Sequence, residues 1–289
     1  MNSNNPYKPG VYFSMTFIAT YVLWFAGAAI SFQNENNEWY MFLMLLGLIA
    51  PFVISLGMTW ASGNAELKKD FLNRLINFKL IPIKMLPAAL FIMPLSVLVA
   101  TAISLLFGES VDQFQLAKEF SFTTGFVPVL SLLLLAATFE ELGWRGYAFD
   151  SLHSRYNALY ASILFGVLWS LWHLPLLFVK NSYQYEIAQQ DIGYAINFFV
   201  SIIPMGVIIS WICLKNNKSV LAAIGFHFVV NISQEALAMT QVTKCIQTGV
   251  LFVFAIIIIV LEKELFFSKK HIVQERCETE HFTASLKTA

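Results

Sequence analysis

Long apolar runs, separated by short polar stretches, follow one another along almost the whole chain. A helix that crosses the hydrocarbon core of a bilayer needs about 20 predominantly apolar residues. Eight runs reach this length, and they predict an all-α, polytopic integral membrane protein of about eight transmembrane helices. The predicted spans are 11–32, 39–61, 85–107, 125–149, 158–179, 192–214, 220–241 and 246–267, of which the fourth and seventh are the least hydrophobic.

The polar stretch 62–84 has the pattern of an amphipathic helix. Five apolar residues fall near one helical face and three cations towards the other: Leu67, Phe71, Leu72, Leu75 and Phe78 against Lys68, Lys69 and Arg74. Such a helix can lie among anionic headgroups or pack on the end of the bundle, and the sequence favours neither. Segment 268–289 is expected to be a polar tail. Because no repeat or linker divides the chain, residues 1–289 are predicted to form one domain.

The distribution of lysine and arginine predicts that both termini are cytoplasmic. With eight crossings, all but three of the 18 Lys and Arg residues fall on the side of the N-terminus and the tail. Lys118, Lys180 and Lys244 are the exceptions. Cytoplasmic loops carry such an excess of positive charge. The expected location is the cell membrane of a prokaryote or the endoplasmic reticulum of a eukaryote.

Composition supports a membrane protein and excludes other classes. The chain is 57% hydrophobic and 12% charged, whereas soluble domains are about 45–50% apolar and about 25% charged. The 18 Lys and Arg residues are balanced by 18 Asp and Glu residues, which excludes the basic face that nucleic-acid binding requires. Cys213, Cys245 and Cys277 are too few and too scattered for a disulfide framework or a cysteine-based zinc site.

Ionisable and polar side chains interrupt three of the predicted spans. An ionisable group deep in a span costs about 2.5–3.5 kcal/mol or more, so each is a candidate functional residue. Nearby Trp169, Trp172 and Phe226 are expected to be packing residues. The candidates are Glu140, Glu141 and Arg145 in 125–149, His173 in 158–179, and His227 and Asn231 in 220–241.

The spacing within these spans separates the candidates by role. Glu141 and Arg145 are four residues apart, which favours a helical ion pair and leaves Glu140 without an intrahelical cation. A carboxylate without a cation can act as a general base or acid. His227 and Asn231 are also four residues apart, so their polar ends share one helical face.

The depths of the three spans' polar groups predict that they meet in one cavity. At the helical rise, Glu140 lies about 13 Å and His227 about 10 Å from the same membrane boundary. His173 lies deeper, about 22 Å from the start of its span by the same arithmetic. Pro175 lacks an amide hydrogen and should loosen the helix beside His173.

Three kinds of chemistry fit this set. Glu140, His173 and His227 resemble the His₂Glu ligands of a catalytic zinc, although no H-E-x-x-H motif is present. In metal-free hydrolysis, Glu140 and His173 would activate water while His227 and Asn231 donate to the oxyanion. A proton- or ion-coupled transporter would use the same residue types, but it favours broken helices in two related halves.

Three motifs resemble those of the CAAX protease and bacteriocin-processing superfamily. They are Glu140-Glu-x-x-x-Arg145, an aromatic-x-x-x-His at Trp169 and His173, and His227-x-x-x-Asn231. Within that superfamily, the layout of eight spans resembles that of the type II CAAX prenyl endopeptidases, or Ras-converting enzymes. We expect an archaeal member of this family. The aromatic residue of the second motif is usually phenylalanine in this family, whereas here it is Trp169.

The resemblance implies a metal-independent intramembrane glutamate protease without a cofactor. Its substrate would be a prenylated C-a-a-X protein or peptide, cut after the prenylated cysteine to release the last three residues. Glu140 and His173 would be the catalytic pair and His227 and Asn231 the oxyanion donors, with Glu141 and Arg145 in support. Two alternatives stay open, namely another hydrophobic peptide substrate and a non-hydrolytic immunity or scaffold protein. Membrane lipid is an expected partner, nucleic acid is not, and no oligomeric state is predicted.

Overall fold

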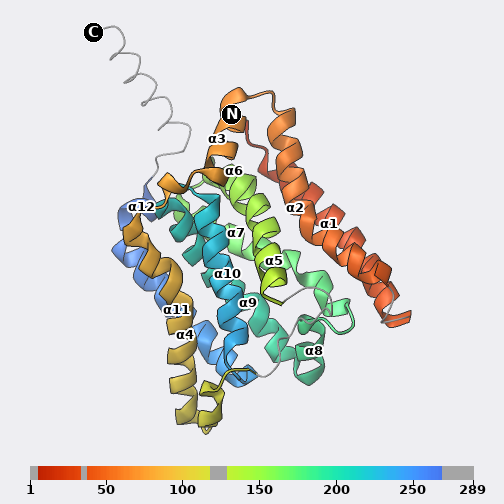
Figure 1. Ribbon diagram of the computed structural model, residues 1–289, viewed down its shortest axis with the longest axis vertical. Coiled ribbons are helices and arrows are strands. Elements are labelled where there is room, and N and C mark those ends of the chain that lie inside the picture. The colour runs from red at the N-terminus through yellow and green to blue at the C-terminus, as the bar shows by residue number, and fades with distance from the viewer. Residues whose placement is uncertain (1–5, 34–37, 118–128, 269–289) are drawn as a thin grey trace.

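The computed structural model describes residues 6–33, 38–117 and 129–268, which form helices and the turns between them (Figure 1). Within these ranges the chain has no β-strand, and one isolated bridge pairs Leu116 with Leu237. The predicted all-α class is therefore confirmed for the part of the chain that the structure describes. The tail 269–289, with Cys277, lies outside it.

The bundle contains helices of very different lengths. The principal ones are α1 (Pro9–Gln33), α2 (Glu38–Ala61), α3 (Ala65–Ile76), α4 (Leu86–Ser104), α5 (Val129–Gly143), α7 (Ala158–Trp172), α8 (Tyr183–Gln190), α9 (Ile192–Lys215), α10 (Val220–Ala236) and α11 (Gln241–Leu261). Two five-residue helices are α6 (Phe149–His153) and α12 (Lys263–Phe267), and the π-helical turn η5 (Trp144–Ala148) joins α5 to α6. Short 3₁₀ helices cover Phe78–Leu80, Ile83–Met85, Leu105–Phe107, Val111–Phe114 and Leu174–Phe178.

Six of the eight predicted spans correspond to helices that are long and apolar enough to cross a membrane. These segments make the chain an integral membrane protein. The other two predicted spans are the shorter helices α5 and α10, and the first residues of the former span, 125–128, lie outside the described ranges. Both short helices pack inside the bundle, α5 between α2 and α10, and α10 against α4, α5 and α9. Eight crossings therefore stay a prediction.

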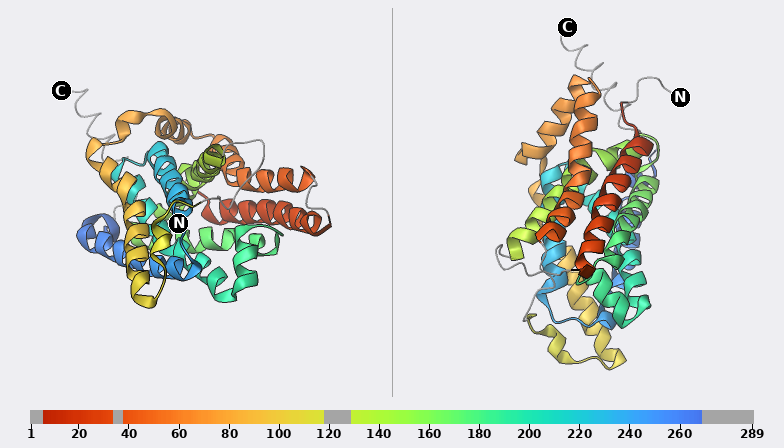
Figure 2. Two further views of the ribbon diagram at one scale, coloured as in Figure 1. Left: turned by 60° about the horizontal axis from the view of Figure 1, so that its bottom comes forward. Right: turned by 90° about the vertical axis from the view of Figure 1, so that its right-hand side faces the viewer.

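The first described residues and α12 lie at the same end of the molecule, together with α3 (Figures 1 and 2). Such an arrangement requires the chain to run along the bundle an even number of times. It agrees with the prediction that the two termini share one side of the membrane. Which side that is stays a prediction from the positive charges.

Glycines bring two helix pairs into backbone contact. A Cβ added to Gly206 of α9 would lie 2.6 Å from the Cα of Gly166 in α7. A Cβ added to Gly143 of α5 would lie 2.6 Å from the backbone of Pro51 in α2. Small residues at such crossings permit the close packing that holds membrane helices together. Helix α5, which carries both candidate glutamates, and helix α7, which His173 caps, are therefore fixed to their neighbours.

Helix α3 confirms the predicted amphipathic segment, but one residue that was expected on its polar face is buried. Asn64 caps α3 by accepting from the amide of Leu67, and the helix ends at Ile76, within the predicted segment 62–84. Leu67 and Phe71 are buried against the bundle. Arg74, predicted on the polar face, is also buried, because it forms an ion pair with Asp150 of α6. The outward face still exposes apolar Ile76, so contact with headgroups stays a prediction.

Candidate functional site

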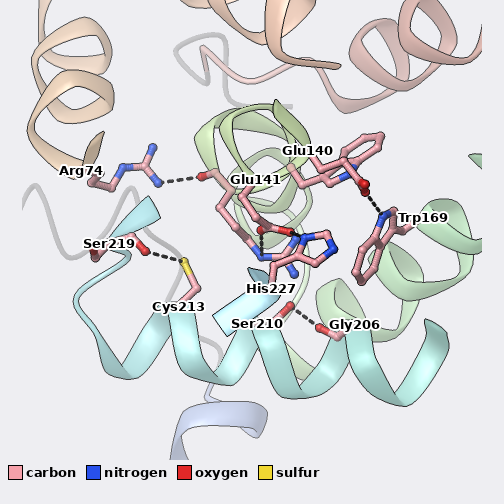
Figure 3. Close-up of polar contacts among 11 residues, drawn as sticks. Arg74, Glu140, Glu141, Trp169, Gly206, Ser210, Cys213, Ser219 and His227 are labelled. Carbon is pink, nitrogen blue, oxygen red and sulfur yellow. Dashed lines mark hydrogen bonds and ion pairs between the residues drawn. The ribbon is translucent and has the colours of Figure 1, made fainter. Parts of the chain in front are cut away.

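Three helices carry the candidate residues. Glu140 and Glu141 lie in the last turn of α5, His173 caps the C-terminal end of α7, and His227 lies in the middle of α10. Figure 3 shows both glutamates and His227 close to Trp169 of α7. The predicted convergence of these side chains is therefore observed, whereas a shared cavity stays a prediction.

Glu140 is buried and is held by two tryptophans. Its Oε2 accepts hydrogen bonds from the indole Nε1 of Trp169 at 2.8 Å and of Trp144 at 3.4 Å. Among the described residues no donor contacts the second oxygen, Oε1. The carboxylate is thus oriented by one oxygen while the other remains available. The interpretation of Trp169 as a packing residue missed this hydrogen bond.

Trp169→Phe tests the contribution of this indole. Phenylalanine keeps an aromatic ring but removes one donor to Glu140, while Trp144 remains. A hydrogen bond to a charged group contributes about 1.5–3 kcal/mol, so we expect kcat to fall by about 10- to 100-fold. Steady-state cleavage of a prenylated peptide, the substrate that the sequence resemblance implies, measures the effect, with thermal unfolding as a control for folding. Complete inactivity in a folded Trp169→Phe variant would contradict this expectation.

His173 lies where α7 breaks. The α-helix ends at Trp172, and residues Leu174–Phe178 continue as a 3₁₀ helix, which confirms the expected effect of Pro175. The Nδ1 of His173 lies 2.8 Å from the carbonyl oxygen of Trp169. A carbonyl can only accept, so Nδ1 carries the proton and Nε2 is left with a lone pair in the neutral ring. That nitrogen is available as a base.

Glu141 connects Arg145 with His227. Its Oε2 lies 3.5 Å from Nε of Arg145, which confirms the predicted ion pair, and its Oε1 lies 3.0 Å from Nδ1 of His227. All three side chains are buried. Arg145 also lies over the ring of Phe165, with 4.1 Å between the guanidinium carbon and the ring centroid. The link to His227, 86 residues away, is not visible in any local spacing.

Asn231 has a different partner from His227. Its Nδ2 donates to the carbonyl oxygen of Leu133 in α5 at 3.1 Å. The two side chains share a helical face, as predicted, but they do not bind a common group among the described residues. Because an amide nitrogen has two hydrogens, one donor of Asn231 remains.

The arrangement gives the zinc hypothesis no support. Among the described side chains, no three His, Cys, Asp or Glu residues lie so that they could hold one metal ion. Glu140 is held by indoles, and the Nδ1 of His227 is bound to Glu141. Metal independence itself stays a prediction.

Comparison with known proteins adds independent information. Residues 122–233, which include every candidate residue, match the family described as type II CAAX prenyl endopeptidase Rce1-like. The chain is also 58% identical over 269 residues to a protein named CAAX prenyl protease 2 from Methanococcus maripaludis. That similarity covers 93% of this chain and 99% of the relative.

Proposed function

Because the chain belongs to the Rce1-like type II CAAX prenyl endopeptidase family, we propose that it cleaves prenylated C-a-a-X tails within the membrane. The cut falls after the prenylated cysteine and releases the a-a-X tripeptide. One observation supports the proposed chemistry. Glu140, His173 and His227 all contact Trp169, within the residues that match the family. A buried carboxylate beside a histidine with a free lone pair suits the activation of water.

In the proposed reaction, Glu140 and His173 act on the attacking water. Oε1 of Glu140 or Nε2 of His173 takes one proton as the water oxygen bonds to the carbonyl carbon of the prenylated cysteine. The carbonyl oxygen becomes an oxyanion. As the carbon–nitrogen bond breaks, the stored proton passes to the nitrogen of the leaving tripeptide. Atoms and protons balance without any further reactant.

His227 and Asn231 are the proposed oxyanion donors. The Nδ1–H of His227 already faces Glu141, so a second donor at Nε2 requires the protonated ring. The Glu141 carboxylate stabilises that imidazolium at 3.0 Å. Asn231 supplies the amide hydrogen that Leu133 leaves free. Glu141 and Arg145 therefore act through His227 rather than on the substrate.

A membrane-embedded site suits a substrate of mixed character. The prenyl chain prefers the bilayer by about 0.8 kcal/mol per buried CH₂, whereas the tripeptide is polar. A site on helices inside the bilayer, near one of its faces, can receive both the lipid and the peptide. Membrane lipid would then surround the substrate as well as the protein.

The experiment that tests this function is cleavage of a farnesylated C-a-a-X peptide by the purified protein, with and without a strong zinc chelator. We expect mass spectrometry to detect loss of the a-a-X tripeptide at an unchanged rate in the chelator. If the chelator abolishes cleavage and added metal restores it, Glu140, His173 and His227 would instead be zinc ligands. Absence of cleavage would favour another hydrophobic peptide, or a non-hydrolytic immunity or scaffold protein.

A further inference from the structure

Arg74 lies in α3, outside all three motifs, and yet it contacts the backbone beside the candidate site. Its side chain is only 2% exposed. Nη1 donates to the carbonyl oxygen of Arg145 and Nη2 to that of Gly146, each at 3.1 Å. Figure 3 shows Arg74 reaching from α3 towards this segment. One guanidinium therefore holds two successive carbonyls.

Both carbonyls belong to the π-helical turn η5. In this wider turn the amide of Phe149 bonds to the carbonyl of Trp144, five residues earlier. Such turns are rare and are frequently found at functional sites. Because the hydrogen bonds of a π turn differ from those of an α-helix, a donor from outside the turn that binds its carbonyls can fix the conformation of the turn.

The same turn supplies the partners of both glutamates. Trp144 donates to Glu140, and Arg145 forms the ion pair with Glu141. A displacement of η5 would therefore change the orientation of the proposed base and of the carboxylate that supports His227. The two site carboxylates share this one short segment.

Close packing and charge fix Arg74 and α3 against η5. A Cβ at Gly146 would lie 2.7 Å from a ring carbon of Phe71, so α3 approaches the turn as closely as glycine permits. Arg74 forms ion pairs with Asp150 at 2.9 Å and Asp70 at 3.0 Å. Burial alone would lower the pKa of Arg74, but these two carboxylates outweigh burial and raise it, so the guanidinium stays charged.

The N-terminal segment adds contacts to the same region. The hydroxyl of Tyr7 donates to Asp150 at 3.4 Å, and the amide of Lys8 donates to the hydroxyl of Tyr147 at 2.9 Å. Tyr147 lies in η5 itself. The turn is thus held from two directions, by α3 and by the start of the chain.

We infer that Arg74 is a positioning residue of the protease site, which holds η5 so that Trp144 and Arg145 orient Glu140 and Glu141. The inference rests on the proposed function, since it assigns Arg74 an effect on cleavage. A misplacement of about 1 Å in a catalytic group can lower a rate by about 100-fold. Loss of the two carbonyl contacts should therefore lower kcat more than substrate binding.

The test separates this role from that of a buried ion pair. Arg74→Met alone leaves Asp150 charged and buried, which can prevent folding. The double variant Arg74→Met/Asp150→Asn removes both charges and keeps an acceptor for Tyr7. In it we expect kcat to fall by about 10- to 100-fold with KM within about twofold of the wild-type value. Arg74→Lys keeps the charge but lacks the two guanidinium NH₂ groups that bind the two carbonyls. Its kcat should therefore lie between those of the wild type and the double variant.

A matched control is Lys215→Met, which breaks the 2.8 Å ion pair of Lys215 with Glu262 and does not touch η5. It should leave kcat unchanged. Hydrogen–deuterium exchange supplies a readout without substrate: amides 144–149 should exchange faster in the double variant than in the wild type. Wild-type kcat and exchange in a folded double variant would overturn the inference. Wild-type protein that does not cleave the peptide would instead count against the proposed function, and the exchange result would still decide whether Arg74 holds the turn.

Discussion

Glu140→Gln should abolish measurable cleavage while the protein remains folded. The amide keeps an oxygen that can accept from Trp169 and Trp144, so the local packing is preserved. It cannot take a proton from water, and general base catalysis contributes about 10²- to 10⁴-fold. We expect kcat/KM for a farnesylated peptide to fall by about 10³-fold or more, with an unchanged unfolding temperature.

Glu262→Gln is the matched control for this variant. Glu262 pairs with Lys215 at the end of α11, away from the residues around Trp169. The same chemical change there should leave cleavage at the wild-type rate. Near-wild-type activity in the Glu140 variant would end the proposal that this carboxylate activates water.

His227→Ala should have the second largest effect, a fall in kcat of about 10²- to 10³-fold, the scale of one oxyanion donor. Alanine removes the proposed Nε2–H donor but leaves the ion pair of Glu141 with Arg145. His227→Gln places an amide donor at a similar distance from the backbone, so we expect it to recover about 10-fold over alanine. Single-turnover cleavage of the prenylated peptide measures both.

The two His227 variants distinguish a hydrogen-bond donor from a proton carrier. If glutamine is as inactive as alanine, His227 transfers a proton and the oxyanion assignment is wrong. His153→Gln is the control. His153 is also a buried histidine, with Nδ1 3.2 Å from the carbonyl of Tyr156, but it lies in α6 outside the site. Its substitution should leave kcat unchanged.

The helices could be predicted from the sequence mainly where a single run of apolar residues decides the structure. Six of the predicted spans correspond to helices of sufficient length and hydropathy. The ranges 125–149 and 220–241 were harder because their polar residues serve contacts inside the bundle rather than with lipid. The carbonyl of Arg145 in the π turn accepts a hydrogen bond from Arg74, which is 71 residues away and is not signalled by any local spacing.

The candidate residues themselves were visible because charge is rare in apolar spans. Their partners were not. The ion pair of Glu141 with Arg145 follows from a four-residue spacing, whereas the bond of Glu141 to His227 joins two different helices. The sequence alone favours a packing role for Trp169 because an indole is mostly apolar, and the role of its one N–H becomes clear only beside Glu140. The prediction that Arg74 lies on the polar face is wrong because its partner, Asp150, lies on another helix.

The glycine contact between α7 and α9 also limits how a lipid-modified substrate can reach the site. A prenyl chain that arrives sideways must pass between neighbouring helices. Where side chains fill the boundary, rotation about their bonds can open a path. At Gly166 and Gly206 the backbones themselves touch, so no rotation can make room. The same holds for Gly143 against Pro51, between α2 and α5. At the level of these contacts both boundaries are closed to sideways passage, so the lipid of the proposed substrate would have to pass where side chains line a boundary.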